Sequence, residues 1–332
     1  MKPDLLRWLV CPEDQAGLNL CEVQRGIGDE IEEGTLTCQQ CGRGYPIRAG
    51  IPRFILQELP IAMDRTRRTF GYEWQTFSDR YDFLERQFVE WIRPLEPSAF
   101  QGKMVLDAGC GSGMYTQFLN HFGAKGVIAL DLSEAIDVAR SLNKFPSCHF
   151  VQGDILSPPF RHGSFDLVFS KGVVHHLPKP GEGVRSLVKL LNERGSLFLW
   201  VYSQEGNGWV VRIVTPIRHY ITSRLPLSVE RSLSFVIAGV LYLIVKGIYL
   251  PAAQSRRPWL KRLLPYAPYL MDHTQYSFRY MHFNVFDHLT APVAHYIPRT
   301  EIEQWFQEHQ FKRVEITSRL GMSWSALGTY AD

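Results

Sequence analysis

Residues able to bind a ligand gather in one short stretch, Val105 to Gly113, which reads VLDAGCGSG. An acid, Asp107, stands at the end of an apolar run, and glycines follow at positions 109, 111 and 113. Glycine at alternate positions lets the backbone turn tightly and approach a ligand closely, because no Cβ stands in the way. The stretch therefore predicts a buried strand that runs into a ligand-binding loop.

This loop differs from the glycine pattern of a dinucleotide site. Such a site requires G-x-G-x-x-G and rests the pyrophosphate of its ligand on a helix N-terminus. Here the third glycine comes one place early, and Asp107 would bring a negative charge close to any diphosphate. A cationic ligand without phosphate fits both facts better. S-adenosylmethionine, with its sulfonium and ammonium groups, is such a ligand.

Acids also stand at the ends of the next two predicted strands. A strand over residues 126–131 ends in Asp131, whose carboxylate is placed to accept hydrogen bonds from ribose hydroxyls. A strand over residues 149–155 carries Asp154, which is placed to accept from an adenine amino group. Each acid alone is equally well explained as a turn former or a helix N-cap. Their common position behind a glycine loop favours the ligand-binding interpretation.

The segments around these acids predict the fold class. A helix is expected over residues 114–122, and two more strands over 165–170 and 196–202. Strands that alternate with helical segments predict an α/β fold with a parallel sheet, whose ligand contacts lie at the carboxyl ends of the strands.

Residues 104–202 resemble the core of a class I S-adenosylmethionine-dependent methyltransferase. VLDAGCGSG, ALDLSEAIDVAR, QGDI and FDLVFSKGVVHHL match the motifs of that family in order. The resemblance implies a Rossmann-like sheet of seven strands, the last antiparallel. It implies that the three loop glycines shape the methionine pocket and that Leu132 packs on the adenine. The implied cofactor-binding residues are Asp107, Ala108, Gly109, Gly111, Gly113, Asp131, Leu132, Asp154, Ile155, and Ser170 or Gly172.

The sequence of residues 1–56 predicts a separate module at the front of the chain. Cys38-Gln-Gln-Cys41 is a C-x-x-C knuckle, in which two thiolates can reach one tetrahedral zinc ion. The first knuckle, Cys11-Pro-Glu-Asp14, has Asp14 where the second Cys would stand. A zinc site of Cys11, Asp14, Cys38 and Cys41 is therefore predicted, because carboxylate oxygen is a legitimate ligand. Cys21 is a substitute ligand, and a metal-free ribbon held by its own small core is the alternative.

The sequence around these cysteines resembles a small zinc-ribbon family known for activating tRNA and protein methyltransferases. The matching segments are LLRWLVCP and LTCQQCGRGYPIRAGIPRF. The resemblance covers nearly the whole module. It implies that a ribbon of this kind, which stabilises or activates a methyltransferase partner, is here fused to one in cis.

Residues 57–100 form a predicted helical bridge between the module and the core. The segment Phe70 to Phe77 is dense in aromatic residues, and Tyr81 to Trp91 has helical spacing. We expect Tyr72 or Trp74 to close over the cofactor or the substrate. The alternative is that these aromatic residues only pack a helix onto the sheet.

The long interval between the core, taken as 101–203, and the end of the chain predicts a helical substrate lid over residues 204–299. From Arg212 to Arg262 there are nine Arg or Lys residues and one acid, Glu230. Residues 232–245 are uncharged, and these fourteen residues are too few to span a bilayer, which takes about twenty. Three interpretations stay open: a buried lid helix, an interfacial helix on acidic lipid, or an interface between the subunits of a homodimer.

Aromatic residues and histidines follow in the same insertion, and His282, Asp287 or His288 could anchor an apolar substrate there. Residues 300–332 should then complete the core. Thr300 and Glu303 form a predicted capping box at the start of a helix, and strands are expected over 311–317 and 322–328.

The combined prediction is an S-adenosylmethionine-dependent methyltransferase with a structural zinc ion. Methyl transfer is an in-line displacement that needs close alignment, and a hydroxyl acceptor also needs a base. His175, His176 and Asp287 are the candidates, in that order. The expected acceptor is a small molecule or an amphipathic lipid-like compound, methylated on oxygen or carbon; an RNA methyltransferase and a non-catalytic cofactor-binding scaffold are the alternatives.

Composition agrees with a folded enzyme. The 332 residues are 45% hydrophobic and 21% charged, with a net charge of +3. There is no long apolar run behind Met1, so a reducing cytoplasmic setting is expected, with possible peripheral contact at the inner membrane surface through residues 212–262.

Overall fold

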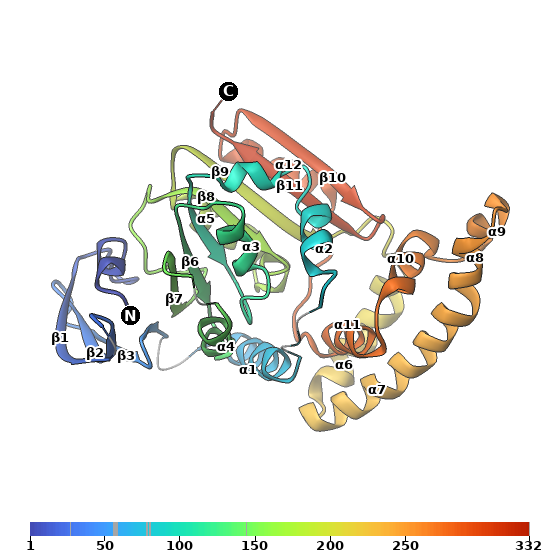
Figure 1. The fold of residues 1–332 in the computed structure, drawn as a ribbon, viewed down its shortest axis with the longest axis horizontal. Helices are drawn as coiled ribbons and strands as arrows, with labels where there is room; N and C mark the ends of the chain where they lie inside the picture. The colour runs from blue at the N-terminus through green and yellow to red at the C-terminus, as the bar shows by residue number, and fades with distance from the viewer. Residues whose placement is uncertain (27, 56–58, 78, 80, 144, 332) are drawn as a thin grey trace.

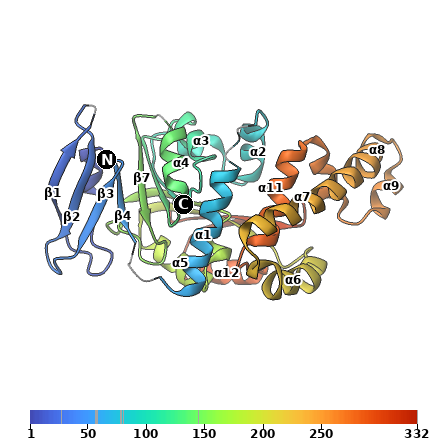
Figure 2. The same cartoon turned by 90° about the horizontal axis from the view of Figure 1, so that it is seen from below.

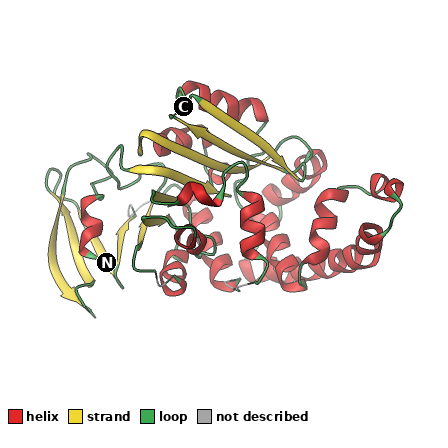
Figure 3. Ribbon diagram, turned by 45° about the horizontal axis from the view of Figure 1, so that its top comes forward, coloured by secondary structure: helices red, strands yellow, loops and turns green. Residues whose placement is uncertain are grey.

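The computed structural model describes residues 1–26, 28–55, 59–77, 79, 81–143 and 145–331. Three parts follow one another along the longest axis: a small β module that carries the N-terminus, a central sheet with helices, and a helical lobe (Figures 1 and 2). The predicted boundary between residues 56 and 57 lies outside the described residues. Strands lie in the first two parts, and the lobe is made of helices alone (Figure 3).

The central sheet has the predicted seven-strand arrangement. Its order is β7-β6-β5-β8-β9-β11-β10. Strands β5 to β9 run parallel, and the last strand, β11, is antiparallel to both of its neighbours, which confirms the expected topology. The strand bounds are Met104–Ala108 (β5), Gly126–Asp131 (β6), Cys148–Gly153 (β7), Phe165–Lys171 (β8), Leu191–Tyr202 (β9), Arg313–Arg319 (β10) and Ser323–Thr329 (β11).

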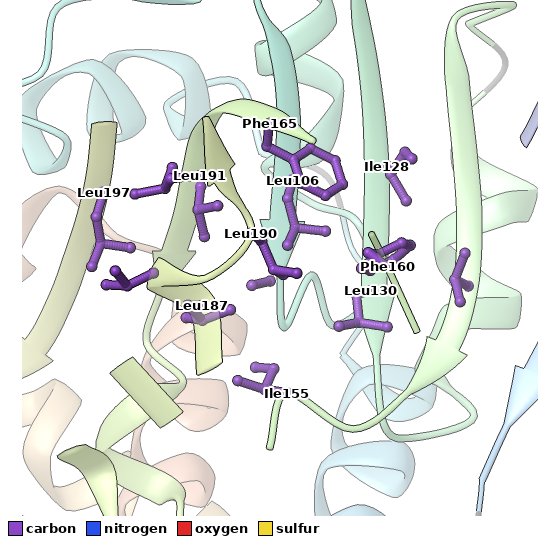
Figure 4. Close-up of a cluster of buried hydrophobic side chains, with 14 of the residues drawn as sticks. Leu106, Ile128, Leu130, Ile155, Phe160, Phe165, Leu187, Leu190, Leu191 and Leu197 are labelled. Carbon is purple, nitrogen blue, oxygen red and sulfur yellow. The ribbon is translucent and has the colours of Figure 1, made fainter. Parts of the chain in front are cut away.

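Helices cover both faces of this sheet, so its central strands are buried on both sides. Two clusters of apolar side chains fill the two faces, and Figure 4 shows part of one, with Leu106, Ile128 and Leu197 pointing into it. The helices of the core are α3 (Thr116–His121), α4 (Ala135–Leu142), α5 (Pro180–Val188) and α12 (Arg299–Glu308), and those of the bridge are α1 (Ile61–Thr76) and α2 (Leu84–Trp91).

The predicted capping box at the start of α12 is wrong. The N-cap is Pro298, and its side chain makes no capping hydrogen bond. Instead, the backbone N–H of Arg299 donates to Glu205 Oε1 at 3.0 Å, and Glu303 pairs with the Arg299 guanidinium at 2.8 Å. Proline fixes the backbone where the chain enters the helix, so Thr300 lies inside the first turn.

The N-terminal module is joined to the core more closely than a separate module would be. Its strands β1 (Leu18–Arg25), β2 (Ile31–Cys38), β3 (Gly44–Arg48) and β4 (Ile51–Phe54) form an antiparallel meander. Strand β4 then pairs in parallel with β7, so that one eleven-stranded sheet runs through both parts. Arg140 of α4 also pairs with Glu30 and Glu32 of the module at 3.2 and 3.3 Å.

The insertion is helical, as predicted, and its long apolar helix is longer and more exposed than a buried lid helix, one of the three interpretations that the sequence left open, would be. Helix α7 (Leu227–Ile244) continues through a π-helical turn, Val245–Tyr249, into α8 (Leu250–Gln254). The continuous helix has 28 residues, enough to cross a membrane by length and composition, and 22% of its most apolar window is buried. The other helices of the lobe are α6 (Thr215–Tyr220), α9 (Pro258–Leu263), α10 (Ala267–Asp272) and α11 (Phe278–Thr290).

Candidate functional site

The glycine loop leaves β5 at the carboxyl edge of the sheet. Gly109 and Gly111 have φ angles of +85° and +54°, a region that L side chains rarely adopt. A Cβ on Gly111 would lie 2.8 Å from the indole of Trp74, and one on Gly109 would lie 2.4 Å from Val173. Only glycine therefore fits where the loop meets these two side chains.

Asp107 is buried behind the loop and holds it to the next helix. The Thr116 hydroxyl donates to its carboxylate at 2.6 Å. Burial raises the pKa of Asp107 to about 7, and the hydrogen bond from Thr116 opposes that rise. The structure thus places Asp107 as expected for a residue that orders the loop.

Asp131 ends β6 beside the same loop. One carboxylate oxygen accepts from the backbone N–H of Gly111 at 2.8 Å, and the other accepts from the Ser133 N–H and hydroxyl at 2.8 and 2.6 Å. Burial raises its pKa, against the effect of these hydrogen bonds. A carboxylate oxygen has two lone pairs, so Oδ2, which accepts only from Gly111, retains acceptor capacity for a ribose hydroxyl.

A cleft of about 750 Å³, including its open mouth, lies over the carboxyl ends of these strands. We call it the loop cleft. The predicted cofactor residues that line it are Gly109, Gly111, Asp131, Leu132, Asp154, Ile155, Gly172 and Trp74.

The other predicted cofactor residues lie elsewhere. Ser170 is buried and donates to the Ala108 carbonyl at 3.0 Å, so both are parts of the sheet. A Cβ on Gly113 would meet Asn143 at 2.5 Å, which places this glycine against α4. Tyr72 faces the lobe, where it lines a groove with Arg231 and Phe235.

A second cavity adjoins the loop cleft on the side of the lobe. We call it the aromatic cavity, because rings from the sheet, the bridge and the lobe line it, together with polar side chains that include Asn207, Asp272, Asn284 and Arg319. Its aromatic lining residues are Trp74, Trp91, Tyr115, Phe169, Trp200, Tyr202, Tyr269, Tyr276, Tyr280, Phe283 and Tyr296. Six residues line both cavities and mark their junction: Trp74, Gly109, Lys171, Gly172, His176 and Asp287.

Lys171 is the residue at this junction that sequence reasoning missed. Its ammonium lies over the rings of Tyr115, Trp91 and Trp200, at 4.1, 4.3 and 5.0 Å from their centroids. Within the described part of the chain, the ammonium forms no ion pair. Burial lowers the pKa of Lys171 to about 7, although Asp287 and Asp107 favour the charged form.

Of the three predicted base candidates, the structure places His176 and Asp287 at the junction and His175 away from both cavities. His175 is fully buried, neither ring nitrogen has a partner among the described residues, and it lines neither cavity. Burial lowers its pKa well below the usual value, so the ring is neutral. His176 does line the junction, with Nδ1 bonded to the Val293 carbonyl at 2.6 Å and a pKa that burial lowers to about 4.

Two further carboxyl groups interact electrostatically here, and of the two only Asp287 lines the cavities. Asp287 of α11 accepts a hydrogen bond from the Tyr202 hydroxyl at 2.8 Å. Glu73 of α1 is fully buried, and neither of its carboxyl oxygens has a partner among the described residues. Burial, and then repulsion from Asp287, raise the pKa of Glu73 well above its usual range. The sequence offered no signal for Glu73, which sits within the aromatic bridge segment.

The predicted metal ligands come together in the N-terminal module. The ligand atoms of Cys11, Asp14, Cys38 and Cys41 all lie within 4.8 Å of one another. Cys11 Sγ and Cys41 Sγ are 3.8 Å apart, the separation expected for two sulfurs about 2.3 Å from one tetrahedral zinc ion. Cys21 lies outside this group, on β1 beside Thr37.

The surroundings of the cluster suit thiolate ligands. The backbone N–H groups of Gln40 and Cys41 point at Cys38 Sγ, at 3.3 and 3.4 Å. Burial raises the pKa of Cys38, but these hydrogen bonds outweigh it and the pKa is lowered. The hydroxyl of Tyr45 lies 3.1 Å from Cys11 Sγ, where it can donate to a thiolate.

Comparisons with known proteins match the N-terminal module and the central core to two different families. Residues 106–199 match the pattern of a methyltransferase domain, and residues 2–50 match that of a Trm112p-like protein. The ubiquinone biosynthesis O-methyltransferase of Erwinia tasmaniensis is 29% identical over 157 residues, 46% of this chain and 63% of that protein. The tRNA U34 carboxymethyltransferase of Pseudomonas aeruginosa (strain LESB58) is 30% identical over 142 residues, 41% of this chain and 44% of that protein.

This chain therefore spans less than two thirds of the length of either relative. Among solved structures, an O-methyltransferase family protein from Burkholderia thailandensis has a TM-score of 0.46 and 13% identity, with 75% of this chain and 57% of that chain covered.

Proposed function

We propose that this chain, a methyltransferase domain with a Trm112p-like domain joined to its N-terminus, transfers a methyl group from S-adenosylmethionine to an amphipathic, lipid-like small molecule. The observation that carries the proposal is the junction of the loop cleft with the aromatic cavity. One cavity suits the cofactor, the other suits an apolar acceptor, and the two open onto the same six residues.

In the loop cleft, Asp131 binds the ribose hydroxyls, Leu132 and Ile155 pack on the adenine, and Asp154 accepts from its amino group. The turn at Gly109 and Gly111 accommodates the methionine end. When bound, the cofactor supplies an electrophilic methyl group on its sulfonium. The side chains at the junction then have to align the acceptor with that group and exclude water, which is the main source of acceleration in such a displacement.

Lys171 is the proposed base for a hydroxyl acceptor. A base works best when its pKa lies near the working pH, and the pKa of Lys171 is lowered to about 7 whereas that of His176 is lowered to about 4. As the acceptor oxygen bonds to the methyl carbon and the carbon–sulfur bond breaks, the proton leaves the oxygen for the neutral Nζ. The aromatic rings around Nζ stabilise the ammonium that results.

His176 and Asp287 take positioning roles in this proposal. The Nδ1–H of His176 donates to the Val293 carbonyl, which leaves Nε2 as an acceptor toward the cavity. Asp287 holds the Tyr202 ring in the wall. The hydroxyls of Tyr276 and Tyr280 accept hydrogen bonds from the Gln87 side-chain amide, so these two rings present mainly their apolar faces to the cavity. This lining favours an apolar or aromatic acceptor over a nucleotide.

The proposal is tested by transfer of label from methyl-labelled S-adenosylmethionine to a cell extract separated into lipid, RNA, protein and small-molecule fractions. We expect label in the lipid or small-molecule fraction. Label in RNA would show that the acceptor is RNA and not a lipid-like molecule, and the Trm112p-like domain would then become a candidate for RNA recognition. Cofactor binding without label in any fraction would indicate a non-catalytic scaffold.

We expect Asp131→Ala to weaken cofactor binding by about ten- to a hundred-fold, because hydrogen bonds to a charged group each contribute about 1.5–3 kcal/mol. Isothermal titration with S-adenosylmethionine measures the change. Glu193→Ala, which removes an exposed acid at the far end of β9, is the matched control and should bind like the parent. Parent-like affinity in a folded Asp131→Ala protein would show that the ribose site is elsewhere.

A further inference from the structure

Exposed apolar side chains concentrate on the helical lobe. Of the twenty large hydrophobic residues found exposed in the described part of the chain, sixteen lie between Trp209 and Leu263. On α7 they form a stripe with alternating spacings of three and four: Val229, Leu233, Val236, Val240 and Leu243. Val236 and Leu243 are 63% and 72% exposed. A contiguous apolar stripe of this kind marks an interaction surface rather than the scattered exposure of ordinary surfaces.

The adjacent face of the same helix is fixed to the protein. Ala238 and Val245 are buried against Met281 and Val285 of α11. The Ser234 hydroxyl lies 3.0 Å from His282 Nε2, and Lys246 Nζ donates to the Thr274 carbonyl at 2.6 Å. The helix is therefore part of a packed lobe and runs along its outer edge (Figures 1 and 2), and its apolar stripe is exposed.

Basic residues surround this stripe. Arg224 and Arg231 lie at the start of α7, and Arg256, Arg257, Lys261 and Arg262 lie around α9 at its other end; all six are exposed. None of them forms an ion pair with another described residue. The single acid of the region, Glu230, is buried, and burial raises its pKa to about 7. Trp259 and Leu263 of α9 are exposed among the basic side chains.

We propose that the face formed by α7, α8 and α9 docks on the surface of a membrane rich in anionic lipid, with α7 lying in the plane of the interface. Apolar side chains between basic flanks match the two layers of such a surface, the acyl boundary and the anionic headgroups. Tryptophan is enriched at that depth. The Val and Leu side chains of the stripe on α7 give nucleic-acid bases nothing to stack on, which argues against RNA along that stripe.

The orientation of α7 in the plane of the interface follows from its packing on α11. A spanning helix must present apolar surface on all sides or bury its polar groups among other spanning helices. Here one side of the helix is held to α11 by Ser234 and His282, and α11 itself carries Asp287 of the aromatic cavity. The docked face would thus lie on the same lobe as the proposed acceptor cavity, so an acceptor dissolved in the membrane would reach it by a short path. The docking itself does not depend on the proposed methyl transfer.

Sedimentation of the cofactor-free protein with vesicles tests the docking. The probes are vesicles of phosphatidylcholine alone and of phosphatidylcholine mixed with phosphatidylglycerol. We expect binding to the anionic vesicles to be at least about ten-fold stronger, and Arg256→Glu/Arg257→Glu to remove most of that difference, because each basic residue near the surface contributes about 1 kcal/mol. Val236→Asp/Leu243→Asp should lower binding by at least about ten-fold. Val314→Asp, at an exposed apolar position on β10, is the matched control and should bind like the parent.

Three outcomes would overturn the proposal. Folded parent protein, verified by its circular dichroism melt, could fail to bind anionic vesicles. Bound protein could resist extraction with alkaline carbonate, which would indicate a spanning helix. Sedimentation equilibrium without lipid could show a dimer that Val236→Asp/Leu243→Asp converts to a monomer, which would make the stripe an interface between two copies of this chain. Each of these results leaves the cofactor titration and the label-transfer experiment unaffected, so failure of the docking is distinguishable from failure of the proposed reaction.

Discussion

Lys171→Met is expected to lower kcat by about 10²- to 10⁴-fold while cofactor affinity stays within a few-fold of the parent, because the substitution removes the proposed base and keeps an apolar side chain between the rings. Methyl transfer to the acceptor identified by label transfer measures kcat, and titration measures binding. Lys189→Met, at an exposed position on the turn after α5, is the matched control.

The pH profile separates the role of base from that of a fixed positive charge. Lys171 accepts a proton only when neutral, so kcat of the parent should rise with pH and level off above the pKa of about 7. Burial sets that pKa, while Asp287 from α11 and Asp107 from β5 favour the charged form. Lys171→Arg keeps the charge but cannot lose its proton in this range, and it should be as inactive as Lys171→Met. An active Lys171→Arg enzyme would show that the site needs a cation and not a base.

Removal of the metal is expected to have the second large effect. Cys38→Ser should abolish stoichiometric zinc, measured by elemental analysis, and destabilise the chain by about 3 kcal/mol or more, because zinc binding at such sites contributes directly to folding. For a chain of this size, with an entropy of unfolding of about 2.1 cal/mol/K per residue, that corresponds to a fall in Tm of about 4 °C. The physical reason is that a bound ion would join Cys11 and Asp14 to Cys38 and Cys41, two segments that are far apart in the sequence.

Cys21→Ser is the matched control, because Cys21 is exposed on β1 outside the cluster. It should bind zinc and melt like the parent. Cys38→Ser should also weaken cofactor binding, because β4 of the module pairs with β7 next to Asp154. A purified parent chain that holds no zinc, and whose melting is unchanged by a chelator, would contradict this prediction and favour the metal-free ribbon.

The sequence alone was sufficient for the features that depend on local pattern. The strands around Asp107, Asp131 and Asp154 were predicted because apolar runs end in an acid, and parallel strands must bring such ends to one edge of the sheet. The loop glycines were predictable because only glycine adopts their backbone angles without strain. The four candidate zinc ligands were named because C-x-x-C spacing is a short-range property, and the structure brings their ligand atoms within 4.8 Å.

Features that depend on packing between distant segments were decided only by the tertiary structure. His175 and Lys171 are four positions apart on one short segment. In the folded chain His175 is buried outside both cavities, whereas Lys171 lies at their junction. Tyr72 and Trp74 share helix α1, and its orientation sends one to the lobe and the other to the glycine loop. The same holds for β4, whose pairing with β7 joins two modules that looked separate.

The long helix of the lobe shows the same division. Its apolar composition and basic flanks can be read from residues 212–262, but its length and exposure cannot. Lys246 ends the uncharged run, but the chain stays helical through it because lysine is a good helix former, and its ammonium reaches the Thr274 carbonyl. Helix α11 packs against Ala238 and Val245, and the stripe from Val229 to Leu243 lies outside this contact and stays exposed. Local pattern thus determined which residues can bind and which segments are apolar, while long-range packing decided which of them face a ligand, a core or a surface.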